Sequence, residues 1–294
     1  MCVVAAKYFP EVGWVGVKNR DRNYKPTVHI KQSWRKNVER LYLWDEKTKY
    51  SEGVNEYGVA ILSAATAVKT DEKEGDKSDQ GSNRADFYSP DGRRIRSALF
   101  AKTPEEALAK LIEVEIPGNT LVFNRETCIL LEGSFPVDPD TGVEGDYVYK
   151  HRVIKQDQTV VRTNHGIWLP KAGYQLDSEE EDHRKARISS DARMKRTRAL
   201  IKQVEDPDEM MQCISCQKNK NKQLNPLRTS KTHGKRIMVT TGQLMICASE
   251  KTMHYRPIWS EIEFKYTKLD SVKSKTYFEV VSSRKLLTFK EWEK

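Results

Sequence analysis

The 294-residue sequence lacks a disulfide pattern, a long apolar run and a glycine-rich phosphate loop, and each absence excludes a class of protein. Its five cysteines are odd in number for a chain of this length, so no disulfide framework is expected. A membrane-spanning helix needs a run of about 18 apolar residues, and no run in this sequence is close to that length. No membrane partner is therefore expected. The start, residues 1–10, has neither the basic region nor the cleavage site of a secretory signal, which favours a cytoplasmic location.

Metal and cofactor motifs are also scarce. Cys213 and Cys216 have zinc-like spacing, and His233 and Cys247 follow them. A structural zinc site needs four protein ligands that leave no open position, and the sequence has no second pair of Cys or His residues at zinc-like spacing. The glycine and serine clusters match neither a P-loop nor a dinucleotide fingerprint. We therefore predict no metal and no cofactor.

Positive charge is in excess, with 51 Lys and Arg against 42 Asp and Glu and a formal net charge of +9. Two interpretations stay open: a solubilising surface, or an anionic partner such as nucleic acid, a phosphorylated compound or a carboxylate substrate. The basic stretch 184–202 has the same two interpretations, a solvated helix face or a face that contacts phosphates. A homo-oligomer is compatible with the sequence.

The order of elements predicts an α+β fold with mixed or antiparallel sheets. Thr103-Pro-Glu-Glu has N-cap, N1-proline and capping-box chemistry, which predicts a helix through about Glu113. Further helices are expected at 183–204 and after Pro207. We expect one domain over 1–294, with a polar insertion at about 69–96, a turn at 53–58 and an irregular polar segment at about 210–235. Extended structure is expected at 3–7, 13–17, 29–49, 59–65, 120–123, 128–132, 147–154, 159–162, 237–246, 253–255, 258–266 and 276–281.

Cys2 has a particular chemical potential. A small second residue permits removal of Met1, which places a free α-amine on the residue that carries the thiol. That amine can act as general base for its own side chain. A free α-amine has a pKa of about 7.7–8.0, and a nearby cation would lower that pKa and also favour the thiolate. By itself Cys2 is a weak signal, because a small buried residue at a strand start is also compatible with it.

An ordered set of motifs follows Cys2. Lys18-Asn-Arg-Asp21 ends the first hairpin, Gly53-Val-Asn-Glu-Tyr-Gly-Val-Ala60 follows, and Val161-Arg-Thr-Asn-His165 comes before Ser189-Ser-Asp-Ala-Arg193 and Arg196. This order resembles the cysteine N-terminal nucleophile (Ntn) hydrolases of the choloylglycine hydrolase, penicillin V acylase and acid ceramidase group, and the related penicillin acyltransferases. The resemblance covers roughly residues 1–198. It implies a four-layer αββα sandwich of two stacked antiparallel sheets.

The resemblance also implies roles around the nucleophile. Cys2 would be the nucleophile and, through its α-amine, the base, and Asp21 would orient that amine. Lys18 or Arg20 would be the cation near the thiol. The family usually has arginine where this sequence has Lys18, so which of the two points at Cys2 stays open.

The remaining roles fall on later segments. Asn164 would donate its side-chain amide to the oxyanion, and Arg196, or alternatively Arg193, would be the cation on the facing helix. His165 is either a structural residue or a proton shuttle. Many relatives have a second oxyanion asparagine before the first long helix, and none is cleanly placed here. Asn83 and Ser89 lie inside the polar insertion, and a main-chain N–H is the alternative second donor.

The sequence therefore predicts an amidohydrolase that cleaves a non-peptide, linear C–N bond through a Cys2 acyl-thioester. Its partner would be a small-molecule amide, and the surrounding Arg and Lys residues hint at an anionic group on it. Two alternatives remain: an acyltransferase on the same fold, or a non-catalytic Ntn-fold protein that binds nucleic acid or another anionic partner.

Overall fold

Two antiparallel sheets form the centre of the structure, a computed structural model that describes residues 2–22, 24, 26–66, 92–136, 145–228, 239–258 and 285–287. Within these residues the first sheet has six strands in the order β10-β1-β2-β11-β12-β13. The second has seven strands in the order β3-β4-β5-β6-β7-β8-β9. The strands of the first sheet are β1 (Val3–Phe9), β2 (Gly13–Arg22), β10 (Val160–Arg162), β11 (Val239–Cys247), β12 (Thr252–Pro257) and β13 (Lys285–Leu287). Those of the second are β3 (Val28–Arg35), β4 (Val38–Asp45), β5 (Ser51–Asn55), β6 (Ala60–Ala64), β7 (Gly118–Phe123), β8 (Cys128–Ser134) and β9 (Val148–Ile154).

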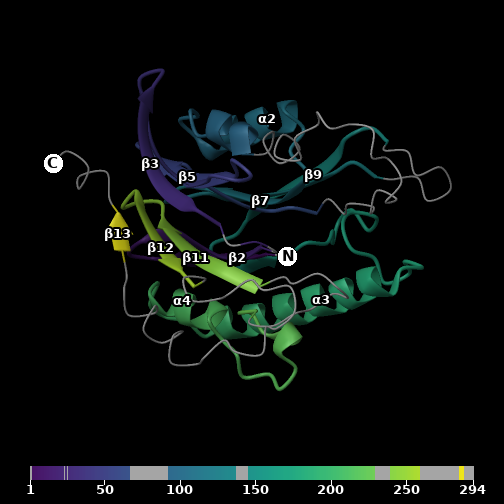
Figure 1. The fold of residues 1–294 in the computed structure, drawn as a ribbon. Helices are drawn as coiled ribbons and strands as arrows, with labels where there is room; N and C mark the ends of the chain where they lie inside the picture. Colours follow the sequence, from purple (N-terminus) through teal and green to yellow (C-terminus); the bar gives the residue numbers. More distant parts are fainter. Residues whose placement is uncertain are drawn as a thin grey trace.

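Helices cover the outer face of each sheet (Figure 1). Helix α2 (Pro104–Glu113) lies over the second sheet, and α3 (Glu181–Lys202) and α4 (Glu209–Ile214) lie over the first. The predicted start of α2 is confirmed, because the Thr103 side chain accepts a hydrogen bond from the Glu106 main-chain N–H and Pro104 opens the helix. The predicted αββα sandwich is therefore the observed architecture.

Alternating side chains on the strands fill three separate apolar layers. Between the two sheets lie Val4, Trp14 and Phe123 with their neighbours. Val3, Val15 and other residues of the opposite strand faces pack instead against Met194 and Ile201 of α3. Because β2 is buried on both faces, polar residues near its end are also enclosed on both faces.

Three predicted segments differ from the structure. The turn predicted at 53–58 is confined to 55–58, where the Gly58 N–H donates to the Asn55 carbonyl oxygen at 2.9 Å. Residues 53–55 are the end of β5, and the missing side chain at Gly53 allows the close approach of the Leu41 carbonyl oxygen on β4. Residues 92–98, placed in the polar insertion, are helical, with Ile95 in the apolar layer under α2. The helix expected after Pro207 is confirmed as α4, and it extends through residues 210–214, which were also placed in the irregular segment. The strands expected at 258–266 and 276–281 lie outside the described residues, apart from residue 258.

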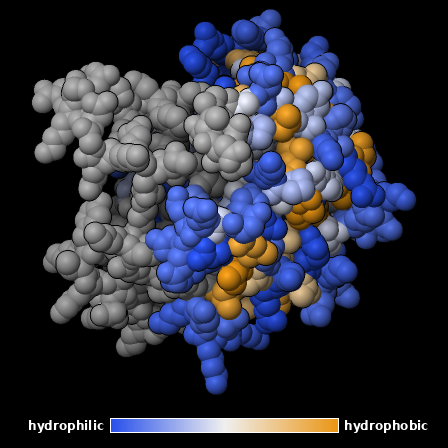
Figure 2. All heavy atoms as spheres, turned by 90° about the vertical axis from the view of Figure 1, so that its right-hand side faces the viewer, coloured by the Kyte–Doolittle hydropathy of each residue, from blue (hydrophilic) through white to orange (hydrophobic). Residues whose placement is uncertain are grey.

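In the coloured part of the face seen in Figure 2, hydrophilic residues predominate and hydrophobic residues form small groups. Large apolar side chains exposed at the surface include Leu176 and Ile188, each 54% exposed. In the part of the chain that the structure describes, no helix has both the length and the apolar character required to cross a membrane.

Candidate active site

Cys2 lies directly before β1, at the end of the first sheet where β2 carries its polar residues. Val3 pairs with Asn19, so Cys2 lies beside the last residues of β2. The residue is 6% exposed and belongs to the apolar layer between the sheets. Its main-chain N–H donates a hydrogen bond to Asn164 Oδ1. The N-terminal end of β1 is thus fixed to a residue 162 positions away in the chain.

The Cys2 thiol faces cations. Arg22 Nη1 lies 3.8 Å from Cys2 Sγ. Burial by itself raises the pKa of the thiol, but Lys18, the positive chain terminus and Arg22 more than offset this and lower the pKa to about 7. The charge of the thiol in turn raises the pKa of Arg22, against the effect of burial. Cys2 is therefore substantially ionised near neutral pH, as a nucleophilic cysteine requires.

Strand alternation divides the polar end of β2 between two sides of the sheet. Lys18, Arg20 and Arg22 point into the space between the sheets, where they meet carboxylates of β4 and β5. Asn19 and Asp21 point to the other side, where Asn19 donates to the main-chain oxygens of Ile214 and Pro226 and Asp21 meets α3. Cys2 therefore sits next to two separate buried charge clusters.

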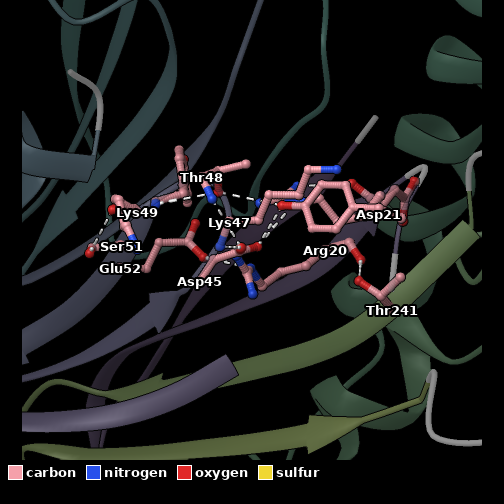
Figure 3. Close-up of polar contacts among 12 residues, drawn as sticks. Arg20, Asp21, Asp45, Lys47, Thr48, Lys49, Ser51, Glu52 and Thr241 are labelled. Atoms are coloured by element: carbon pink, nitrogen blue, oxygen red, sulfur yellow. Dashed lines mark hydrogen bonds and ion pairs between the residues drawn. The ribbon is translucent and has the colours of Figure 1, made fainter. Parts of the chain in front are cut away.

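The cluster between the sheets holds three cations and two carboxylates. Lys18 Nζ pairs with Glu52 and also donates to the Ser63 carbonyl. Arg20 lies 3.5 Å from Asp45 and 3.6 Å from Glu52, and Figure 3 shows its side chain directed at these two residues. Arg22 lies 3.6 Å from Asp45. Three positive charges against two negative charges leave one in excess, which a Cys2 thiolate would neutralise.

The cluster on the helix side holds one carboxylate and two arginines. Arg193 Nη1 lies 2.7 Å from Asp21 Oδ2, and Thr240 Oγ1 donates to Asp21 Oδ1 at 2.8 Å. Arg228 is fully buried and donates to Ser189 Oγ at 2.6 Å. Burial and the charge of Arg193 lower the pKa of Arg228 to about 9, although Asp21 opposes the change. Burial raises and Arg193 lowers the pKa of Asp21, and the net shift is downward, which keeps this carboxylate ionised.

Of the two arginines considered on the facing helix, Arg193 contacts Asp21 and Arg196 does not. The Arg193 side chain is fully buried and also donates to the main-chain oxygens of Asn225 and Pro226. Arg196 lies on the exposed side of α3. The reason is geometric: the buried stripe of α3 runs through Ser190, Arg193 and Thr197 at helical spacing, and Arg196 falls outside it.

Asn164 lies just after β10 and is 7% exposed. Its side-chain orientation is fixed by its partners, because the Cys2 N–H can only donate and the Ala65 carbonyl can only accept. Oδ1 therefore faces Cys2, and Nδ2 donates to Ala65 at 2.5 Å. The amide nitrogen carries a second hydrogen, which is the one that could reach an oxyanion.

The sequence did not single out Arg22 or Arg228, although both carry charge to the site. Arg22 follows Lys18 and Arg20 at intervals of two, so a longer predicted β2 would have placed it on the same face. Arg228 lies in irregular chain, where no local pattern indicates burial. Asn83 and Ser89, considered as a second oxyanion donor, lie outside the described residues. His165 is buried beside Asn164 and contacts Ser190.

No group of three or more metal-ligating side chains is present among the residues that the structure describes. Cys213 lies in α4, and Cys216 follows that helix by two residues. His233 is outside the described residues. Burial raises the pKa of the Cys213 thiol, which disfavours the thiolate that a metal would need.

Comparison with known proteins gives likenesses of fold. No protein-family model matches the chain, and no curated protein matches it in sequence. The structure is similar to that of penicillin V acylase from Agrobacterium tumefaciens, with 12% identity, a TM-score of 0.48, and 87% of this chain and 83% of the acylase covered.

Conjugated bile acid hydrolase from Clostridium perfringens is also similar. A cysteine-to-alanine mutant of it has 10% identity and a TM-score of 0.47, with 99% of this chain and 93% of that chain covered. An arginine-to-leucine variant has 12% identity and a TM-score of 0.46, with 98% and 97% covered.

Proposed function

We propose that this protein is an N-terminal cysteine hydrolase that cleaves a non-peptide amide bond, with Cys2 as the nucleophile. The observation that carries the proposal is the environment of Cys2. Its nitrogen is held by Asn164 Oδ1, and its thiol, with the pKa lowered to about 7, lies 3.8 Å from Arg22. Removal of Met1 turns that nitrogen into a free amine and leaves Asn164 as its hydrogen-bond acceptor.

The proposed reaction proceeds in two steps. Cys2 Sγ attacks the carbonyl carbon of the amide, and the thiol proton passes to the α-amine. The α-amine then gives this proton to the leaving nitrogen as the C–N bond breaks, which leaves a Cys2 acyl-thioester. Water attacks the thioester, releases the carboxylic acid and restores the thiol.

The surrounding residues have distinct proposed roles. The second hydrogen of Asn164 Nδ2 stabilises the oxyanion, and such a donor typically lowers the barrier by about 2.7–4 kcal/mol. Lys18 and Arg22 favour the thiolate. Asp21, fixed by Arg193 and Thr240, provides the negative charge that orients the amine. Arg20 holds Asp45 and Glu52 in place behind the two cations.

The substrate is proposed to be a small amide with an anionic group. Each of the two charge clusters beside Cys2 has one more cation than carboxylates in the described residues, and Cys2 as thiolate balances only one of them. A carboxylate or similar group on the substrate would balance the other.

A panel of acyl amides, read by mass spectrometry, tests the proposal. We expect the wild type to hydrolyse at least one of them and Cys2→Ala to be inactive. Cys247→Ala is the matched control, because Cys247 is also buried in the first sheet, on β11, and is expected to be dispensable. Equal turnover by the wild type and Cys2→Ala would refute the proposal.

A further inference from the structure

The main chain around Asn164 is fixed by side chains from both halves of the sandwich. From α3, Ser190 Oγ accepts the Asn164 main-chain N–H at 3.3 Å. From β7 in the second sheet, Asn119 Nδ2 donates to the carbonyl oxygens of Thr163 and His165 at 2.8 and 3.0 Å. Asn119 and Ser190 are fully or almost fully buried. The residues on either side of Asn164 and its own N–H are thus held by neutral side chains that the proposed reaction does not use.

Ser190 in turn belongs to a buried hydrogen-bonded cluster with Thr163 and His165. Its Oγ lies 2.8 Å from His165 Nδ1 and 2.8 Å from Thr163 Oγ1. His165 Nε2 lies 3.0 Å from Asp191 Oδ1, on a residue that is 26% exposed. Nε2 makes no hydrogen bond to this carboxylate, so the hydrogen-bonded contacts of the ring are those of Nδ1 with Ser190 and Thr163.

Two properties of this cluster concern the charge of His165 and the proton of Ser190. Burial and the charge of Arg187 lower the pKa of His165 to about 4, so the imidazole is neutral at neutral pH. The Ser190 hydroxyl donates to Thr163 Oγ1, and a lone pair of the same oxygen accepts the Asn164 N–H. The cluster of Thr163, His165 and Ser190 therefore provides one defined acceptor for the Asn164 N–H.

Ser, His and Asp in this order are also the side chains of a nucleophilic triad. Ser190 cannot serve as a nucleophile in the observed structure, because it lies in the buried stripe of α3, is 1% exposed and has its hydroxyl in contact with three partners. We propose instead that Ser190 and Asn119 are positioning residues that hold Asn164, and through it the Cys2 nitrogen, in place. The inference rests on the proposed function, in which Asn164 and Cys2 meet the substrate.

Loss of this support has a measurable consequence at Cys2. Cys2 precedes β1, and its nitrogen is held by Asn164. If Asn164 shifts, the Cys2 thiol loses its fixed position 3.8 Å from Arg22. Its pKa then rises towards the ordinary cysteine value, because burial remains while the cationic neighbour is no longer held close.

The test compares Ser190→Ala with Thr197→Val. Both changes remove one buried hydroxyl from the same stripe of α3, but Thr197 Oγ1 has no hydrogen-bond partner among the described residues. The readout is the pH midpoint of Cys2 alkylation by iodoacetamide, with the Cys2 peptide separated from the other cysteines by mass spectrometry. We expect the midpoint to rise by about one pH unit or more in Ser190→Ala, the low end of what a neighbouring charge contributes, and to stay unchanged in Thr197→Val. An unchanged midpoint in folded Ser190→Ala would overturn the proposal.

Hydrogen exchange in the wild type keeps the test decisive if Ser190→Ala does not fold. The Asn164 amide should exchange far more slowly than the amide of Asp157, which lies in an exposed turn. Exchange at similar rates would overturn the positioning role. Neither measurement needs a substrate. The positioning role can therefore be refuted separately from the proposed function, which is tested by the turnover of Cys2→Ala.

Discussion

Replacement of Arg22 by glutamine is the sharpest test of how the Cys2 thiol is activated. Arg22 Nη1 lies 3.8 Å from Cys2 Sγ, and Coulomb's law with an effective dielectric constant of about 20 gives an attraction of about 4 kcal/mol. That is an upper limit of about 3 pKa units. Arg22 also faces Asp45 at 3.6 Å, and Lys18 continues to act on the thiol. We therefore expect the thiol pKa to rise from about 7 by about one to two units.

The pH dependence of Cys2 alkylation measures this change directly. At pH 7 about half of the wild-type thiol is ionised, so a rise of about one to two units should slow alkylation about five- to fiftyfold. Arg125→Gln is the control, because it removes the same charge from a side chain that is 55% exposed and lies beside Glu126. If Arg22→Gln and Arg125→Gln have the same midpoint as the wild type, Arg22 does not activate Cys2.

Three further predictions concern stability. Because the folded state lowers the pKa of Cys2 from 9.0 to about 7, the thiolate's stabilisation is fully present above 9.0 and is lost as the pH falls through about 7. Urea unfolding should show the wild type losing about 2.7 kcal/mol over this range relative to Cys2→Ser, and parallel curves would contradict it. Arg193→Ala leaves Asp21 buried without its closest cation and should lower the free energy of unfolding by about 3–5 kcal/mol. The control Arg196→Ala removes an exposed side chain and should change that free energy by less than about 0.5 kcal/mol. Equal losses in the two variants would refute the assignment to Arg193. Thr103→Ala removes the cap of α2 and should lower the urea unfolding free energy by about 1 kcal/mol, and an unchanged value would show that the cap does not contribute.

Local patterns in the sequence were sufficient for most of the architecture. Two short β-rich runs identified the first hairpin, and the Thr103 capping box identified the start of α2. The turn predicted at 53–58 failed at Gly53, because glycine there allows the close approach of β4 rather than a reversal of the chain. Helix 92–98 was missed because its few apolar residues follow a long polar stretch.

The candidate site was predictable to the extent that it depends on local position. Asn164 accepts the hydrogen bond of the Cys2 main-chain N–H, and the charge of Asp21 acts on the Cys2 thiol, while the roles that the resemblance implies for them stay predictions. The choice between Arg193 and Arg196 could have been made from helical spacing, since Arg193 shares the stripe with Met194 and Ile201. The burial of Arg228 could not be predicted, because its hydrogen-bond partner Ser189 and the charge of Asp21 lie far away in the chain.

The central claim is that Cys2, with a free α-amine, forms the acyl-thioester. The direct measurement is mass spectrometry of the N-terminal peptide after rapid acid quenching during turnover of an amide found in the panel. We predict a peptide that begins at Cys2, without Met1, and that carries the mass of the acyl group on Cys2. Active protein that retains Met1, or an acyl group found on another residue, would contradict the account.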